Sequence, residues 1–307
     1  MPGRTFNSSD YRYGFNGMEK DDEVSGTGNS YTADFWQYDP RLGRRWNVDP
    51  VVKPFESGYS TFLGNPILFV DPNGDDPSTH TDKDGNVVQV IDDGDNSVYK
   101  HDDLSKWDKK SNLPTSEVGV SKMGETEYWD EFRAHSESGA ILPEVAANAK
   151  IRFGESFDED IKQLNSEAKS MSLSEIAENS TLNKKFDIKN DKSIAPDGPN
   201  TGKLLNGKYA TARSAGNYLA GYNGATGNQA GFYISKDTYM RMAGALHQRK
   251  WDGGKTAMKI MFGGASYGSA PYFGETPHAG RRISEGFNRG VSERPPLRMS
   301  SDRKPKY

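Results

Sequence analysis

Three side chains in the C-terminal part of the chain are suited to moving protons: Glu275, His278 and His247. Glu275 follows a glycine and precedes Thr276-Pro277, a good helix start, so its carboxylate is expected at the edge of a cleft. A histidine, a carboxylate and a nearby cation are sufficient for RNA cleavage without a metal, because they supply a base, an acid and a charge for the phosphorane. We therefore predict these three residues as catalytic candidates.

Each candidate also has a structural interpretation. A carboxylate beside a helix N-terminus is stabilised by the helix dipole, and this interpretation of Glu275 is equally well supported. His278 fits an exposed histidine in a first helical turn. His247 fits the end of an amphipathic helix, where a cation suits the dipole. The residues alone leave both interpretations open.

Several residues near these candidates could contact a substrate. Arg249, Lys250 and Trp251 follow His247 and form a basic, aromatic patch able to meet phosphates and stack a base. Asp187 and Lys189 are weaker candidates, since alternating charge is typical of a surface strand. The substrate-binding candidates are Asn217, Tyr222, Tyr272, Arg281, Arg282 and Arg249.

Familiar catalytic and cofactor motifs are missing from the sequence. It contains no HExxH and no phosphate-binding glycine loop with lysine. There is no cysteine, which excludes disulfides and thiol chemistry. Asp82-x-Asp84-Gly85 resembles a fragment of a calcium loop, but the later ligands are absent and a hairpin turn is the better interpretation. We predict no cofactor and no metal.

The segments that must position the candidates carry helix signals. Ser235 and Thr276 are expected N-caps, and Ser156 and Ser172 are expected to cap two earlier helices. The pattern of Lys208–Ala220 favours a helix, whereas Gly221–Gly231 favours a loop or a closely packed turn. Lys255–Phe262 fits a helix or a strand equally well.

The earlier part of the chain carries mainly turn and strand signals. Pro77–Asp103 carries Asp-Gly pairs between short valine-rich runs, so it predicts a β-hairpin. Short helices are expected at Glu127–Arg133 and Pro143–Lys150, and residues 183–201 are expected to be mostly loop. Asp39-Pro40, Asp49-Pro50 and Asp71-Pro72 each favour a turn.

Composition and charge bound the possible functions. The 307 residues allow two small domains, and only 33% are hydrophobic. Residues 201–307 hold 17 Lys/Arg and 6 Asp/Glu, a net charge of +11, while the first 200 residues have a net charge of −15. This asymmetry indicates a basic domain with an anionic partner. No apolar run reaches membrane-spanning length and no signal peptide is apparent, so we expect no membrane partner.

Residues 11–76 resemble the RHS repeat-associated core of large secreted RHS/YD-repeat proteins. The resemblance rests on three blocks in the family's order: YGFNGMEKDDEV, YDPRLGRRWNVDP and GNPILFVDPNG. It implies a piece of a β-shell completed by upstream YD repeats, followed by a variable C-terminal toxin. Many members release the toxin by self-cleavage at two Asp-Pro-x-Gly motifs. Here Asp71 keeps the motif, but Asp49 stands in Asp-Pro-Val-Val, which lacks the glycine.

Residues 185–290 resemble, through shorter motifs, the bacterial polymorphic toxin type 44 domain. The matching pieces are KFDIK, AGNYLAGYNGATG, MAGA and PYFGETP. The family usually has Tyr-Gly-Asp-Asp-Pro at the last piece, so one acid is missing around Glu275. The resemblance implies a secreted effector used in interbacterial competition and guarded by a cognate immunity protein.

The sequence thus predicts an α+β chain in five parts: an RHS core fragment at 1–76, a β-hairpin at 77–103, an acidic, partly helical linker at 104–184, a mostly α-helical toxin-like domain at 185–292, and a basic tail at 293–307. The expected activity is hydrolysis of nucleic acid, with RNA favoured. One alternative is a peptidoglycan hydrolase in which Glu275 works with Asp252 or Glu285. The other is a non-catalytic remnant of an RHS shell protein.

Overall fold

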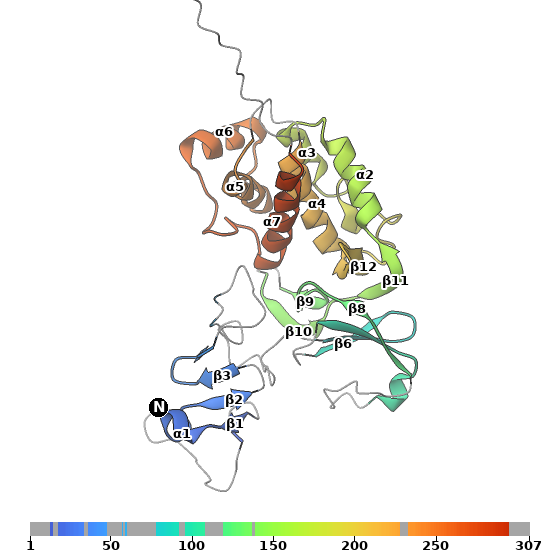
Figure 1. The fold of residues 1–307 in the computed structure, drawn as a ribbon. Helices are drawn as coiled ribbons and strands as arrows, with labels where there is room; N and C mark the ends of the chain where they lie inside the picture. The colour runs from blue at the N-terminus through green and yellow to red at the C-terminus, as the bar shows by residue number, and fades with distance from the viewer. Residues whose placement is uncertain are drawn as a thin grey trace, which may run out of the picture. The chain divides into compact units, whose positions relative to one another are not determined.

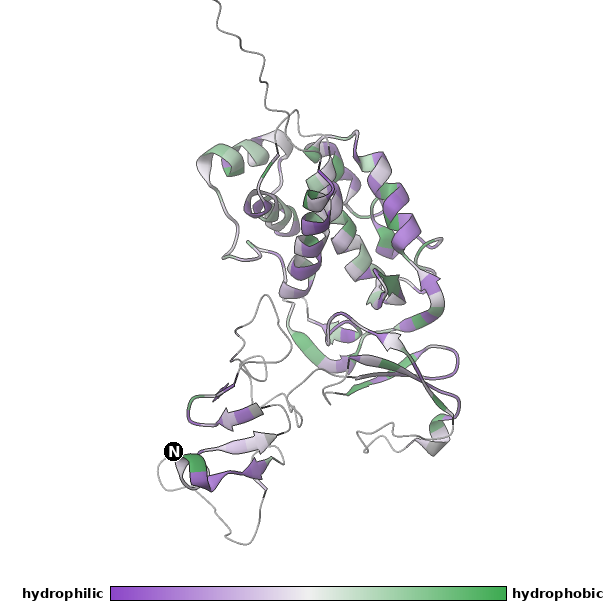
Figure 2. Ribbon diagram, viewed as in Figure 1, coloured by the Kyte–Doolittle hydropathy of each residue, from purple (hydrophilic) through white to green (hydrophobic). Residues whose placement is uncertain are grey.

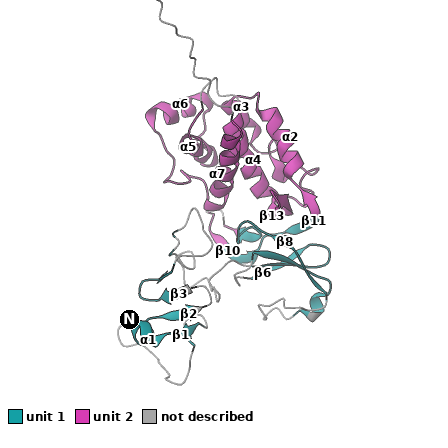
Figure 3. Cartoon of the chain, in the orientation of Figure 1, with its two compact units in different colours: residues 1–134, 142–153 teal, residues 135–141, 154–307 magenta. Residues whose placement is uncertain are grey.

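The computed structural model describes residues 13–14, 18–33, 36–47, 57, 59, 78–91, 96–107, 119–136, 139–227 and 233–294. The chain forms two compact units (Figures 1 and 3). Unit 1 comprises Met1–Ala134 and Leu142–Phe153, and unit 2 comprises His135–Ile141 and Gly154–Tyr307. The described residues form seven α-helices and four small sheets, so the fold is mixed α+β, as expected.

The first sheet of unit 1 is antiparallel, in the order β1-β2-β3-β4. Its strands are β1 (Glu19–Lys20), β2 (Tyr31–Ala33), β3 (Trp36–Asp39) and β4 (Arg44–Arg45), with the short helix α1 (Asp22–Ser25) between the first two. The turn expected at Asp39-Pro40 is confirmed, because the Asp39 carboxylate accepts hydrogen bonds from the backbone and side chain of Arg41 at 2.9 and 2.8 Å. Asp49 and Asp71 lie outside the described residues, so the structure does not test self-cleavage at these positions.

The second sheet of unit 1 has the order β6-β5-β7-β8. It contains β5 (Ser78–Thr81), β6 (Val87–Ile91), β7 (Ser97–His101) and β8 (Val120–Glu125), and the 3-10 helix η3 (Leu104–Lys106) follows β7. The expected hairpin is β5–β6, and Asp82 Oδ1 accepts the backbone N–H groups of Asp84 and Asn86 in its turn. β7 pairs with β5 in parallel, so the segment forms part of a sheet and not an isolated hairpin.

The structure contradicts two of the helices that were predicted from the sequence. Residues 127–132 form turns, and Pro143–Lys150 contributes to β10 (Ile141–Val145), which pairs with β9 (Arg133–His135). Alanine has the highest helix propensity, but intrinsic propensity is a weak determinant of structure, and pairing with a neighbouring strand outweighs it here. Pro143 is tolerated because a two-stranded sheet has only edge strands.

Unit 2 is mostly helical. After β11 (Lys150–Ser156), which begins in unit 1 and ends in unit 2, the elements are α2 (Asp158–Ala168), α3 (Leu173–Asn179), the 3-10 helix η4 (Ile188–Asn190), β12 (Thr201–Leu205), β13 (Lys208–Thr211), α4 (Ala212–Thr226), α5 (Lys236–His247), α6 (Gly253–Gly263) and α7 (Pro277–Ser292). The caps predicted at Ser172, Ser235 and Thr276 are confirmed, since each hydroxyl accepts the expected backbone N–H. The Ser156 hydroxyl accepts the N–H of Asp158, and Phe157 takes the cap position of α2.

Helix α4 corrects two expectations. Lys208–Thr211 is a strand, and the helix continues through Gly221 and Gly224, where a loop was expected. A Cβ at Gly221 would lie 1.9 Å from the carbonyl oxygen of Ile283, and one at Gly286 would lie 1.9 Å from that of Tyr218. These glycines therefore let α4 and α7 approach closely, and this contact offsets the low helix propensity of glycine.

The core of unit 2 draws on residues expected to be linker. Phe157, Ile161 and Ile176, from and beside α2 and α3, are buried with Leu219 of α4. A second buried cluster joins α5, α6 and α7 through Met240, Ile260 and Phe287. In Figure 2, α2 is coloured mainly as hydrophilic and α6 carries hydrophobic turns, so α2 contributes only a narrow apolar stripe to the core.

Candidate active site

A cavity of about 440 Å³ lies in unit 2. Residues of α3, η4, α4, α5 and the start of α7 surround it, together with His135, Ser136 and Gly139. Its lining residues with ionisable or amide side chains, apart from Tyr239, are His135, Asp187, Lys189, Arg213, Asn217, His247, Glu275 and His278. A cavity of this size, with apolar walls and a few converging polar groups, is the usual form of a ligand site.

Glu275 and His247 form a pair at this cavity. Glu275 Oε2 lies 3.2 Å from Nδ1 of His247. His247 is the last residue of α5, and Glu275 immediately precedes Thr276, the N-cap of α7. The Glu275 side chain is 9% exposed and that of His247 is 41% exposed, so the imidazole is the member that reaches solvent.

Burial dominates the electrostatics of this pair. It raises the pKa of Glu275 to about 8, although the charge of Lys189 and the backbone N–H of Thr276 favour the ionised carboxylate. Burial also lowers the pKa of His247, and Lys189 lowers it further. The pair therefore binds and releases a proton close to neutral pH, which is the property that general acid–base catalysis needs.

Lys189 is held at the cavity by a tight local structure. Asp187 Oδ2 accepts hydrogen bonds from the backbone of Asn183 and the side chain of Asn190, both at 2.7 Å. Lys189 Nζ lies 3.9 Å from Asp187 Oδ1. The surface strand expected here is wrong, because residues 188–190 form η4 and Asp187 is buried. This turn places a cation beside the Glu275–His247 pair.

One face of α4 lines the cavity. Arg213, Gly216, Asn217 and Ala220 recur at helical spacing, so they share this face. Gly216 and Ala220 contribute no side chain or only a methyl group to this lining. Among the residues that the structure describes, none makes a hydrogen bond with the Asn217 side chain, which leaves its amide available to a ligand.

Two histidines meet at another part of the wall. His278, in the first turn of α7, lies with Nε2 3.1 Å from the hydroxyl of Ser214. Its ring centroid is 4.6 Å from that of His135. A Cβ at Gly139 would lie 2.6 Å from the Thr276 side chain, so residues 135–141 pack closely against the start of α7. The structure thus brings Glu275, His247, His278 and Asn217, four of the candidates named from the sequence, to one cavity.

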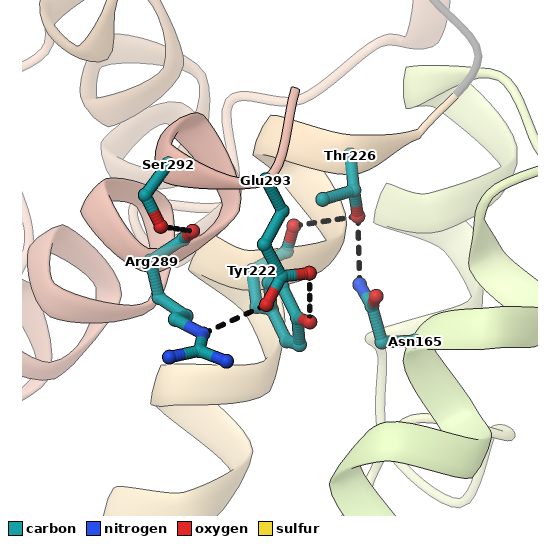
Figure 4. A network of polar contacts seen from close by, with 6 residues as sticks. All are labelled: Asn165, Tyr222, Thr226, Arg289, Ser292 and Glu293. Atoms are coloured by element: carbon teal, nitrogen blue, oxygen red, sulfur yellow. Dashed lines mark hydrogen bonds and ion pairs between the residues drawn. The ribbon is translucent and has the colours of Figure 1, made fainter. Parts of the chain in front are cut away.

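The other predicted substrate-binding residues do not line this cavity. Tyr222 donates a 2.5 Å hydrogen bond to Glu293, whose carboxylate also accepts from Arg289 at 2.8 Å (Figure 4). Arg281 and Arg282 are buried within unit 2, and Arg282 pairs with Glu285 at 2.9 Å. The exposed Arg249 lies just beyond α5. Tyr272 lines a second cavity, described below.

Sequence analysis did not identify His135 or Arg213, and it ranked Lys189 and Asp187 low. Arg213 had a usable signal, since it stands one helical turn before Asn217 on the same face. His135 had none, because it comes from a segment distant in sequence. Comparisons of the chain with protein-family models, with curated proteins and with solved structures found no match.

Proposed function

We propose that the chain is the C-terminal part of an RHS-type secreted toxin whose unit 2 hydrolyses nucleic acid, with RNA as the favoured substrate. The observation that supports this most directly is the Glu275–His247 pair, placed with Lys189 in one cavity. The pair supplies proton transfer and Lys189 supplies positive charge, which is what phosphodiester cleavage requires.

The proposed reaction assigns a task to each group. The 2′-hydroxyl oxygen of the ribose attacks phosphorus, and the P–O5′ bond breaks. His247, oriented by Glu275, exchanges one of the two protons involved, taken from the 2′-hydroxyl or given to the leaving O5′. His278, hydrogen-bonded to Ser214, exchanges the other. Lys189 and Arg213 stabilise the charge that develops on the phosphorane oxygens.

The biological setting follows from the family resemblances. An RHS-type toxin is delivered to a competing cell, and a cognate immunity protein protects the producing cell. The upstream YD-repeat shell would be the partner of residues 11–76. The described residues include no helix that is both long and apolar enough to cross a bilayer.

Peptidoglycan hydrolysis is the second candidate, and one observation favours it. Glu275 has the raised pKa of a carboxylic acid that protonates a glycosidic oxygen. The cavity contains a second carboxylate, Asp187, while Asp252 and Glu285, the partners expected from sequence, do not line it. A glycosidase would therefore pair Glu275 with Asp187.

Purified full-length chain, incubated with total RNA and separately with peptidoglycan sacculi, separates the candidates. A nuclease degrades RNA, and Glu275→Gln and His247→Gln each lower the rate by about 10²-fold or more. The matched control is Glu178→Gln, which changes an exposed residue of α3 and should retain activity. Release of muropeptides with intact RNA selects the glycosidase. If neither polymer is cleaved, and expression is harmless with and without an export signal, the chain is a structural remnant.

A further inference from the structure

A second cavity, of about 430 Å³, lies beside the first in unit 2. It is formed by the end of α5, by the loop after α6 that contains Tyr267 and Ser269, and by the turn from Tyr272 to Pro277. Both cavities are lined by His247, Glu275 and Thr276. Glu275 and His247 therefore lie between the two cavities and line both of them. The other lining residues, apart from Thr276, belong to one cavity or the other.

The two linings differ in charge. The first cavity contains the cations Lys189 and Arg213 and, besides Glu275, one carboxylate, Asp187, 3.9 Å from Lys189 Nζ. In the second, the described lining residues include no lysine, arginine or aspartate, and beyond the shared pair they offer tyrosines, Gln248, Ser269 and backbone. An anionic group is therefore stabilised in the first cavity, and an uncharged polar or aromatic group fits the second.

Close backbone packing shapes the second cavity. Gln248 Nε2 donates a 2.7 Å hydrogen bond to the carbonyl of Gly274. A Cβ at Gly268 would lie 2.4 Å from the backbone nitrogen of Gly274, and Gly274 itself has a φ of +110°, so larger residues do not fit there. The Tyr272 ring packs against Gly280 of α7, whereas Tyr267 is half-buried beside the hollow.

We propose that the two cavities are the two sides of one polynucleotide site. The scissile phosphate lies in the first cavity, and the nucleoside on the leaving-group side lies in the second, where its base stacks on Tyr267. This inference rests on the proposed nuclease function. It adds that efficient cleavage needs a nucleoside, and not merely any alcohol, as the leaving group. Any base can stack on a tyrosine ring, so this cavity should bind a nucleoside of any base and give no sequence specificity.

Two substrates that differ only in the leaving group test this inference: uridylyl(3′–5′)adenosine and the methyl ester of uridine 3′-phosphate. Cleavage of both yields the same cyclic phosphate. We expect kcat/KM to be at least about tenfold higher for the dinucleotide, and Tyr267→Ala to lower that ratio by about fivefold or more. Tyr267→Phe keeps the ring and should keep the ratio.

Equal kcat/KM for the two substrates would overturn the inference, and so would a ratio that survives Tyr267→Ala. If the full chain cleaves neither, the proposed function fails, and binding of the 2′-deoxy analogues of both compounds, measured by calorimetry, decides the subsite. Tighter binding of the dinucleotide that is lost in Tyr267→Ala supports the second cavity as a nucleoside site. Equal affinities exclude it.

Discussion

Glu275 Oε2 lies 3.2 Å from Nδ1 of His247, although the two residues come from opposite ends of different helices. His247 closes α5 and Glu275 precedes α7, so the packing of these helices creates the pair. Burial keeps the carboxylate protonated in the neutral range, with a pKa of about 8. The buried Glu275 carboxyl should therefore affect both the pH dependence of the stability of unit 2 and its proposed chemistry.

Stability should fall as pH rises toward 8 because of Glu275. Below its ordinary pKa of 4.5 the carboxyl is protonated in both states and contributes no pH dependence. Between that value and about 8 the unfolded chain loses the proton while the folded chain retains it, so the free energy of unfolding decreases by roughly 3–5 kcal/mol and then levels off. Chemical denaturation of wild type and Glu275→Gln from pH 4 to 9 measures this.

Glu275→Gln should remove that decline and make the chain more stable than wild type at pH 9, even though the proposed function predicts a rate about 10²-fold lower for this variant. Glu178→Gln, at an exposed position, should show the wild-type curve. Parallel curves for wild type and Glu275→Gln would mean that the carboxyl is ionised and paired at neutral pH. Glu275 would then lack the proton that the peptidoglycan-hydrolase candidate requires it to donate.

Removing the charge of Lys189 should shift the pH profile of activity upward. This charge lowers the pKa of both Glu275 and His247, so Lys189→Met should raise the pKa of each. The measurement is kcat/KM against pH, in which apparent pKa values should move to higher pH. Lys192→Met removes an exposed lysine that does not line the cavity and should leave the profile in place. An unshifted profile for Lys189→Met would show that this lysine is not electrostatically coupled to the reacting groups.

Gly221→Ala should destabilise unit 2 strongly. The added Cβ would lie 1.9 Å from the Ile283 carbonyl oxygen, so α4 and α7 would have to separate, at a cost of about 2–4 kcal/mol. Gly216→Ala in the same helix is the matched control. Its Cβ would meet only Ile188 at 4.0 Å, and alanine should stabilise the helix by about 0.5–1 kcal/mol. Thermal unfolding of both variants gives the comparison, and equal melting temperatures would contradict it.

Tyr222→Phe should weaken stability and leave catalysis intact. The tyrosine donates to Glu293 across the α4–α7 contact, and its burial together with that hydrogen bond raises the pKa of Tyr222 to about 12 (Figure 4). Loss of a half-buried hydrogen bond to a charged group should lower the free energy of unfolding by about 1–2 kcal/mol. Because Tyr222 does not line the cavity, kcat/KM of the folded variant should equal that of wild type. A drop in kcat/KM at unchanged stability would restore its predicted role in substrate binding.

Local signals in the sequence were sufficient for several features. Ser172, Ser235 and Thr276 cap their helices as predicted, because a cap depends on a hydroxyl and on backbone groups within three residues. The turn at Asp84-Gly85 is equally local, since it needs a residue with positive φ, and Gly85 has φ +83°. Glu275, placed between a glycine and a helix start, could be selected as a candidate for the same reason.

Only the tertiary structure decided the rest. Glycines 221 and 224 break a helix by local preference, yet they lie in α4 because α7 and Tyr239 pack against them. Whether a polar residue lines the cavity depends on distant elements. The sequence analysis therefore ranked Lys189 low and did not identify His135, although both line the cavity, and it selected Arg282, which lies buried beside Glu285. The raised pKa of Glu275 likewise comes from burial in the folded chain, and no spacing along the chain encodes that burial.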